Sequence, residues 1–183
     1  MSYSDSMVVH RTVRDGEAKA VEAIDNSFTT DSVIEVTASD DGFRLRFVPV
    51  EPPLRKVYPD DEDDGAEGGE TLVALDDGEL CGAVTFAYEA WNRRLFIADV
   101  RVAPAHRGRG VGRGLVDRAL ARGRELGART AWLEVTSVNA PAVRAYRRMG
   151  FAVCGLDMSL YAGTSSRGEV ALFMSRALDE GEF

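Results

Sequence analysis

The sequence predicts an α/β fold built on a mixed, mainly antiparallel sheet with helices on both faces. In the first half, strand-like segments are joined by Asp40-Asp41-Gly42 and Asp76-Asp77-Gly78, which are typical hairpin turns. In the second half, segments with helical periodicity follow strand-like segments. A helix in this place forms a crossover connection between two strands of a sheet. Strands first and crossovers later indicate an α+β arrangement. A chain of 183 residues with 45% hydrophobic residues fits one domain, 1–183.

The N-terminal third contains three expected strands and one expected helix. Residues 7–13 form the first strand, and Asp15 caps a helix from 16 to about 26. Strands 32–38 and 43–50 follow because polar and apolar residues alternate there. Proline cannot donate to a ladder, so Pro49, Pro52 and Pro53 are expected to end the second of these strands.

Three segments lack the pattern of a packed element. Residues 1–6 and 177–183 are expected to be loose tails, and the run of Asp, Glu and Gly at 59–70 a solvated loop. The alternative for Asp60 to Asp64 is a function, in which these charges gather a polycationic acceptor.

The rest of the chain alternates strands and helices. Strands are expected at 71–75, 80–87 and 95–102, followed by a helix from 111 to 126 that Gly127 closes. A strand at 130–135, a helix at 140–149 and strands at 151–156 and 170–174 complete the fold.

Charge and cysteine content exclude several classes of protein. The net charge of −8 argues against a nucleic-acid surface and is compatible with a cationic partner. No charged-then-apolar leader and no apolar run of 18 residues is present, so we expect a soluble cytoplasmic protein that has no contact with a membrane. Cys81 and Cys154 lie in apolar segments, which predicts buried, reduced thiols, and no metal site is expected.

The segment 103–116 predicts an anion site, because a strand, a glycine–arginine loop and a helix start meet there. Free amides and the positive end of the helix dipole attract phosphate. Arg107, Arg109 and Arg113 add charge that matches phosphate oxygens. The alternative is that these arginines coat a solvated helix start. No Gly-Lys-Ser/Thr follows, so the loop is not a Walker motif.

Two motifs resemble the GNAT superfamily of N-acetyltransferases. Arg107-x-x-Gly110-x-Gly112 after a strand resembles the pyrophosphate loop of that family. Trp132-Leu133-Glu134-Val135, Asn139-x-x-Ala142-x-x-x-Tyr146 and Met149-Gly150-Phe151 resemble its second motif. The resemblance implies a six- to seven-stranded GNAT sheet and acetyl-CoA as co-substrate. The residues implied to bind it are Val100, Val102, Arg107, Gly108, Arg109, Gly110, Val111, Gly112, Arg113, Asn139, Ala142 and Tyr146.

Within the superfamily the sequence is most similar to the streptothricin (nourseothricin) acetyltransferases. The similar stretches are 25–31, 49–61, 91–95 and 155–161. This implies a cationic small-molecule acceptor, streptothricin, which carries amines on a β-lysine arm. Such an acceptor needs carboxylates and aromatic faces. The implied acceptor residues are Asp25, Phe28, Glu35, Trp91, Asp99, Glu134, Asp157 and Tyr161.

Two carboxylates compete for the role of general base. An alkyl ammonium has a pKa near 10.4 and must lose a proton before it attacks a thioester. Leu133 and Val135 share one strand face, so Glu134 points to the other; the resemblance also implies Glu134 as the base. Its alternative is a solvated strand position. Asp99 is the rival, and its alternative is a structural ion pair with Arg101 or Arg93.

The resemblance also implies the groups that hold and release the coenzyme. Tyr146 is the implied acid for the departing thiolate, and Asn139 bonds the pantetheine arm or, alternatively, caps a helix. Strand 95–102 is expected to splay from the next parallel strand, so that the amide of Val102 polarises the thioester carbonyl.

Two other functions stay open at this point. One is a GNAT enzyme that acts on a protein N-terminus or another polyamine. The other is a non-catalytic acyl-CoA sensor, against which the intact Glu134 and Tyr146 argue. The oligomeric state, a homodimer included, is open as well.

Overall fold

The structure, a computed structural model, describes residues 8–58 and 68–179. These residues belong to two compact units, which are described one at a time. The first unit comprises the described residues of 1–26, 64–131 and 177–183, and the second those of 27–63 and 132–176. The predicted tail 1–6 and most of the acidic segment 59–70 lie outside the described residues.

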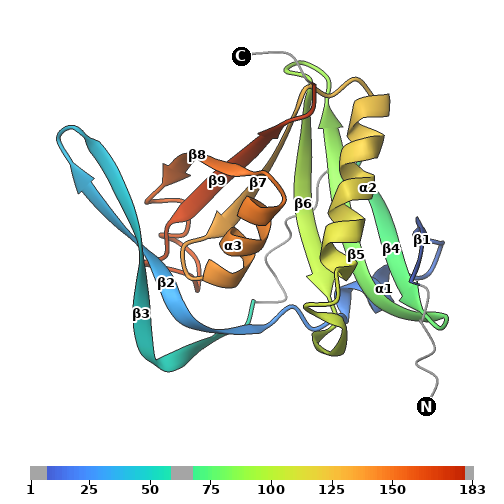
Figure 1. Ribbon diagram of the computed structural model, residues 1–183, viewed down its shortest axis with the longest axis horizontal. Coiled ribbons are helices and arrows are strands. Elements are labelled where there is room, and N and C mark those ends of the chain that lie inside the picture. The colour runs from blue at the N-terminus through green and yellow to red at the C-terminus, as the bar shows by residue number, and fades with distance from the viewer. Residues whose placement is uncertain (1–7, 59–67, 180–183) are drawn as a thin grey trace. The chain divides into compact units, whose positions relative to one another are not determined.

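The first unit contains four sheet strands in the order β1-β4-β5-β6. They are β1 (Val9–Thr12), β4 (Glu70–Asp76), β5 (Glu79–Glu89) and β6 (Arg94–Val102), and each neighbouring pair is antiparallel. Helix α2 (Val111–Glu125) lies across β4, β5 and β6 (Figure 1). The predicted hairpin at 76–78 is confirmed: Asp77 and Gly78 both have positive φ, as a tight hairpin turn requires.

The core of the first unit lies where α2 faces this sheet. Leu115, Val116, Ala119 and Leu120 of α2 are buried, as their helical spacing predicts. On the sheet side, Leu95 lies against Gly123 of α2, and Val84 shares the strand face of Gly82, which lies against Leu115. Val73 belongs to a second buried cluster with Val21, Ile24 and Ala83. Helix α2 ends at Glu125, and Gly127, with φ of 88°, follows its C-cap as expected.

The first helix is shorter than predicted. Helix α1 spans only Ala18–Glu22, and its N-cap is Glu17 rather than Asp15. The Glu17 carboxylate binds the Arg11 guanidinium at 2.7 Å and accepts the Arg14 amide at 2.8 Å. These bonds lower the pKa of Glu17 to about 2, the Arg11 hydrogen bond contributing most. They hold 11–17 as a turn, so the helix starts later.

The prediction of a loose C-terminal tail is wrong for residues 177–179. Leu178 is 7% exposed, and its N–H donates to the Arg129 carbonyl at 2.8 Å. Arg124 Nε donates to the Leu178 carbonyl at 3.1 Å, and Arg129 pairs with Asp179 at 3.3 Å. A single apolar residue gives no periodic signal, so the sequence did not reveal this docking.

The second unit contains a long hairpin and three strands of a sheet. Strands β2 (Phe28–Ser39) and β3 (Gly42–Lys56) form the hairpin, drawn blue and teal in Figure 1. The sheet has the order β7-β9-β8, formed by β7 (Thr130–Thr136), β9 (Ala171–Ala177) and β8 (Ala152–Asp157), with β8 and β9 antiparallel. Helix α3 (Ala140–Arg148) packs on β2, where Arg144 donates to Ser32 Oγ at 2.9 Å.

The prolines do not end β3, contrary to the prediction. The strand continues through Pro49, Pro52 and Pro53 to Lys56. A register shift at Thr30/Ser32 accommodates this segment, since Ser32 pairs with Pro49 and Thr30 with Leu54. In a two-stranded ribbon each strand has an unpaired edge, so a missing N–H is tolerated.

The prediction of two buried thiols holds for one cysteine only. Both are free; Cys81 is buried and Cys154 is exposed. Cys154 lies at the irregularity between Val153 and Gly155 in β8, where a bulge redirects the side chain.

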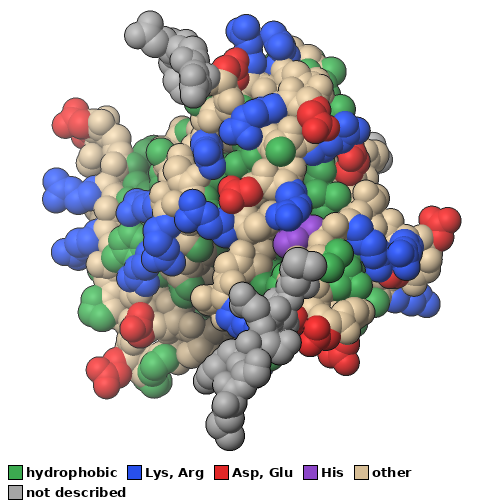
Figure 2. All heavy atoms as spheres, turned by 45° about the vertical axis from the view of Figure 1, so that its right-hand side comes forward, with side chains coloured by type: hydrophobic (Ala, Val, Ile, Leu, Met, Phe, Trp, Pro, Cys, Tyr) green, Lys and Arg blue, Asp and Glu red, His purple; other side chains and the backbone are tan. Residues whose placement is uncertain are grey.

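Surface charge and helix length complete the description. Figure 2 shows Lys and Arg side chains dispersed among Asp, Glu and hydrophobic side chains on the face that it draws. None of the helices in 8–58 and 68–179 is long and apolar enough to cross a membrane. In the same residues, no three His, Cys, Asp or Glu side chains are grouped so that they could hold a metal ion.

Candidate active site

The glycine–arginine loop of the first unit leads from β6 into α2. Strand β6 ends at Val102, a short 3₁₀ turn spans Pro104–His106, and α2 starts at Val111 with Gly110 as its N-cap. Gly108 and Gly110 have φ of 72° and 86°, a conformation that glycine adopts without strain. No side chain caps the helix, and a Cβ on either glycine would meet nothing within 4 Å. Space is therefore open beside both glycines at the start of α2, where the first-turn amides have no side-chain cap, and this arrangement fits a diphosphate.

The three arginines of this loop have different partners. Arg107 donates from Nε to the Val102 carbonyl at 2.9 Å and from Nη2 to the Asp25 carbonyl at 2.5 Å. Arg107 therefore braces the loop on the backbone. Arg109 lies 3.6 Å from Asp76, and Arg113 lies 3.7 Å from Asp117 one turn along α2. Both pairs are long and the two guanidinium groups are more than half exposed, so they can turn toward an anion.

Asp76 and His106 form a second brace that the sequence did not reveal. His106 Nε2 lies 3.1 Å from Asp76 Oδ2, and the Asp76 side chain is only 11% exposed. This contact ties the β4–β5 turn to the start of the loop. Burial, and next the Asp76 charge, raises the pKa of the nearby Cys81 thiol, which stays protonated. The only feature of the sequence that involved this contact was the hairpin turn predicted at 76–78.

The remaining predicted residues of the first unit lie on or beside β6. Asp99 accepts from Arg101 Nε at 2.6 Å, and Arg101 Nη1 donates to the Glu22 carbonyl at 2.7 Å. The structural ion pair named as the alternative for Asp99 is therefore present. Val100 and Val102 belong to β6, and Trp91 at the turn before it is 87% exposed. Arg107 contacts the backbone carbonyl of Asp25, not its carboxylate.

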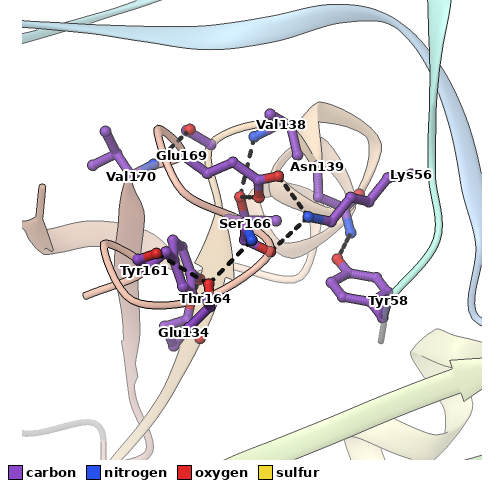
Figure 3. A network of polar contacts seen from close by, with 12 residues as sticks. Lys56, Tyr58, Glu134, Val138, Asn139, Tyr161, Thr164, Ser166, Glu169 and Val170 are labelled. Carbon is purple, nitrogen blue, oxygen red and sulfur yellow. Dashed lines mark hydrogen bonds and ion pairs between the residues drawn. The ribbon is translucent and has the colours of Figure 1, made fainter. Parts of the chain in front are cut away.

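In the second unit, β7 places Glu134 as predicted. Leu133 and Val135 are buried, while Glu134 lies on the other strand face and is partly buried. The Tyr161 hydroxyl donates a hydrogen bond to the Glu134 carboxylate (Figure 3). Burial and this bond raise the pKa of Tyr161, so its phenol stays a neutral donor.

Helix α3 places Asn139, Ala142 and Tyr146. Asn139 caps the helix by accepting the Ala142 amide at 3.1 Å, and its Nδ2 donates to the Tyr58 hydroxyl at 3.0 Å (Figure 3). The capping alternative for Asn139 is thus present. Tyr146 packs edge-on against Phe151, with ring centroids 5.9 Å apart. Phe28, a predicted acceptor wall, lies 6.0 Å from the Tyr58 ring.

Two predicted acceptor carboxylates have structural partners. Glu35 of β2 pairs with Arg46, its neighbour across the hairpin, at 2.9 Å. Asp157 accepts the Ser159 hydroxyl and amide and the Leu160 amide, so it caps a turn. The Ser159 hydroxyl and then these amides lower the pKa of Asp157. Each group is exposed enough to meet a ligand, yet neither is without a partner.

A partly buried ion pair near Glu134 was missed by sequence reasoning. Lys56 Nζ lies 2.5 Å from Glu169 Oε1 and donates to Ser166 Oγ at 2.7 Å (Figure 3). Thr136 Oγ1 donates to Glu169 Oε2 at 2.5 Å. The side chains of Lys56 and Glu169 are 11% and 16% exposed. A lysine and a glutamate 113 residues apart give no local signal.

Comparison with known proteins agrees with this geometry. Residues 39–151 match the acetyltransferase (GNAT) family. The chain is 56% identical over 174 residues to a streptothricin acetyltransferase of Streptomyces lavendulae, covering 90% of this chain and 92% of that protein. It is 36% identical to a streptothricin acetyltransferase of Escherichia coli, over 75% of this chain and 77% of that one.

A solved structure extends the likeness to the whole fold. The crystal structure of a nourseothricin acetyltransferase superposes with a TM-score of 0.87 at 56% identity, covering 94% of this chain and 99% of that one. The predicted α/β fold class is confirmed. With its glycine loop, its sheet strands and the match over residues 39–151, this chain is a member of the acetyltransferase (GNAT) family.

Proposed function

We propose that this enzyme transfers the acetyl group of acetyl-CoA to an amine on the β-lysine arm of a streptothricin-class antibiotic. The observation that carries the proposal is the 56% identity, over 90% of the chain, to a streptothricin acetyltransferase. Acetylation removes one positive charge from the drug, which weakens its attraction to an anionic target.

The donor is proposed to bind through the loop of the first unit. Its diphosphate accepts hydrogen bonds from the first-turn amides of α2, which no side chain caps. Arg109 and Arg113 contribute charge, while Arg107 holds the loop in shape. Val100, Val102, Asn139 and Ala142 are proposed to contact the pantetheine arm. The amide of Val102 is proposed to polarise the thioester carbonyl.

The chemistry is proposed to use Glu134 and Tyr146. Glu134 takes a proton from the acceptor ammonium, which frees the nitrogen lone pair. The nitrogen attacks the thioester carbon, a C–N bond forms, and the C–S bond breaks. Tyr146 donates its phenolic proton to the departing thiolate. The nitrogen still carries two protons after the attack, and it returns one of them through solvent to the tyrosinate, while Glu134 releases its proton to solvent. The products are an amide and coenzyme A.

The cation is proposed to be recognised by carboxylates and rings from the predicted set, together with Tyr58, which the prediction did not include. Glu134 and Tyr161 are in contact with each other, and Phe28 and Tyr58 provide aromatic faces in the same unit. Asp25, Glu35, Trp91, Asp99 and Asp157 stay in the proposal as secondary contacts. Among these, Glu35 pairs with Arg46, Asp99 pairs with Arg101 and Asp157 caps a turn, so a cation bound there competes with those contacts.

Thiol release from acetyl-CoA tests this function directly. Streptothricin, an N-terminal peptide and spermidine are offered as acceptors, and mass spectrometry identifies the product. We expect turnover with streptothricin and a mass gain of one acetyl group. Turnover with the peptide or spermidine alone would overturn the acceptor class. Binding of acetyl-CoA without turnover of any acceptor would indicate a sensor.

A further inference from the structure

The hydroxyl of Tyr161 contacts the carboxylate proposed as the general base. Tyr161 donates to Glu134, and burial together with this bond raises the pKa of the phenol. A phenol with a raised pKa remains a donor at neutral pH. A carboxylate that accepts such a bond has its charged form stabilised and its rotamer fixed.

The loop that carries Tyr161 is itself closely hydrogen bonded. At its start, Asp157 caps the turn through Ser159 and Leu160. In its middle, Thr164 donates its amide and its hydroxyl to the Tyr161 carbonyl, both at 3.0 Å. Hydrogen bonds within the loop therefore restrain the chain both before and after Tyr161.

The end of this loop is anchored to two strands. Glu169 uses both oxygens, one for Lys56 of β3 and one for Thr136 of β7. Lys56 also donates to Ser166 Oγ, and Val170 N–H donates to Ser137 Oγ at 3.0 Å. Figure 3 shows this anchor and the Tyr161–Glu134 pair in one network.

Strand β7 couples the two contacts. Glu134 and Thr136 are two residues apart and lie on one strand face. The loop thus touches that face at Glu134 through Tyr161 and at Thr136 through Glu169.

We infer that Tyr161 is a positioning residue that orients the Glu134 carboxylate and keeps it ionised, and that the Lys56–Glu169 ion pair positions Tyr161. This inference rests on the proposed function, because it needs Glu134 to act as the base. Tyr161 was predicted from sequence as an acceptor wall. The structure places its hydroxyl on the base instead.

Tyr161→Phe removes the hydroxyl and keeps the ring. We expect kcat to fall about tenfold and the acidic limb of the rate profile to move up by about one pH unit, as one lost charge-assisted hydrogen bond predicts. The KM for acetyl-CoA stays unchanged. Tyr88→Phe is the matched control, since it removes a phenol from the other unit and leaves the profile as it is. An unmoved acidic limb, or a rise in the KM for the amine alone, overturns the inference.

The ion pair is tested by Glu169→Gln and Lys56→Met, with Glu125→Gln as the control. We expect each to move the acidic limb in the same direction as Tyr161→Phe but by less. In combination with Tyr161→Phe neither adds a further shift, because both act through one hydroxyl. Additive shifts overturn the role of the ion pair. Thermal denaturation shows that each variant is folded.

A measurement independent of turnover separates this inference from the proposed function. The Glu134 carboxyl is followed by carbon-13 NMR titration and assigned by its loss in Glu134→Gln. We expect Tyr161→Phe to raise the pKa of Glu134 by about one unit. If the wild type turns over no acceptor while this shift occurs, the function fails and the positioning stands. If the pKa does not move, the positioning fails whatever the substrate.

Discussion

At the scale of single residues, the structure distinguishes the two candidate bases by their partners. Asp99 is paired with the permanent charge of Arg101 at 2.6 Å, which is the arrangement of a structural carboxylate. Glu134 accepts a hydrogen bond from the neutral phenol of Tyr161. A carboxylate held by a neutral donor keeps more of its basicity than one held by a guanidinium.

Replacement of each carboxylate by its amide tests this distinction. Glu134→Gln is expected to lower kcat about 10²-fold, most strongly at low pH where the free amine is scarce. Asp99→Asn is expected to leave kcat within a few fold and to lower the melting temperature, because it removes the ion pair with Arg101. Steady-state rates across pH and thermal denaturation supply the data. If Asp99→Asn abolishes the rate while Glu134→Gln is silent, Asp99 is the base.

Tyr146→Phe examines the proposed acid. The ring still packs edge-on against Phe151, so the fold and the binding of coenzyme A are preserved. We expect kcat to fall by about 10²-fold, because the thiolate leaves without a proton donor, while the Kd for coenzyme A changes little. Calorimetry gives the Kd and the thiol assay gives kcat. Equal losses in both quantities would make the hydroxyl a binding group.

At the scale of secondary-structure elements, the close packing of β5 against α2 positions the loop. A Cβ on Gly82 would lie 3.0 Å from the Arg101 carbonyl and 3.1 Å from Val111 Cγ1. Val111 is the first residue of α2, and its amide belongs to the uncapped first turn. The absence of a side chain at Gly82 therefore sets how close the helix start comes to the sheet.

Gly82→Ala should disturb this packing. We expect a loss of about 1–3 kcal/mol in the free energy of unfolding and a higher KM for acetyl-CoA, because α2 must move away from β5. Gly155→Ala is the matched control: it is also a strand glycine, and its Cβ would meet only Phe173, at 3.6 Å. Urea unfolding and steady-state kinetics measure both effects. A Gly82→Ala enzyme with unchanged stability and KM would contradict the packing argument.

Most helices, strands and turns could be predicted from local sequence pattern. Most of the contacts that hold loops and chain ends in place could not. The helix at 111–125 and the turn at 76–78 were predictable because periodicity and turn residues act over a few positions. Glu134 could be placed by strand alternation for the same reason. The Lys56–Glu169 pair and the docking of Leu178 depend on partners far along the chain, which no local pattern encodes. Helix α1 was overestimated because the Arg11–Glu17 pair competes with the helix start.

At the scale of the whole molecule, net charge matters for encounter with a cation. The chain carries 30 acidic and 22 Lys or Arg residues, and its net charge is −8. A field of this sign attracts a polycationic acceptor over distances that salt reduces. It repels the anionic donor, whose binding depends instead on the local amides and arginines.

Ionic strength therefore affects the two substrates in opposite directions. Raising NaCl from about 0.01 M to about 1 M shortens the Debye length from about 30 Å to about 3 Å. We expect kcat/KM for streptothricin to fall about tenfold as attraction is screened. The KM for acetyl-CoA serves as the internal control and stays constant or decreases. A kcat/KM for streptothricin that does not depend on salt would show that the net charge plays no part.

The bond between Lys56 and Glu169 joins positions 113 residues apart, and it has a consequence during synthesis. A ribosome that has added Lys56 must add 113 further residues before the lysine can meet its carboxylate. Closing so long a stretch costs entropy, which contacts formed by the intervening residues must offset. The Tyr161 segment therefore cannot acquire this anchor before residue 169 has been synthesised, and products truncated before that residue lack it.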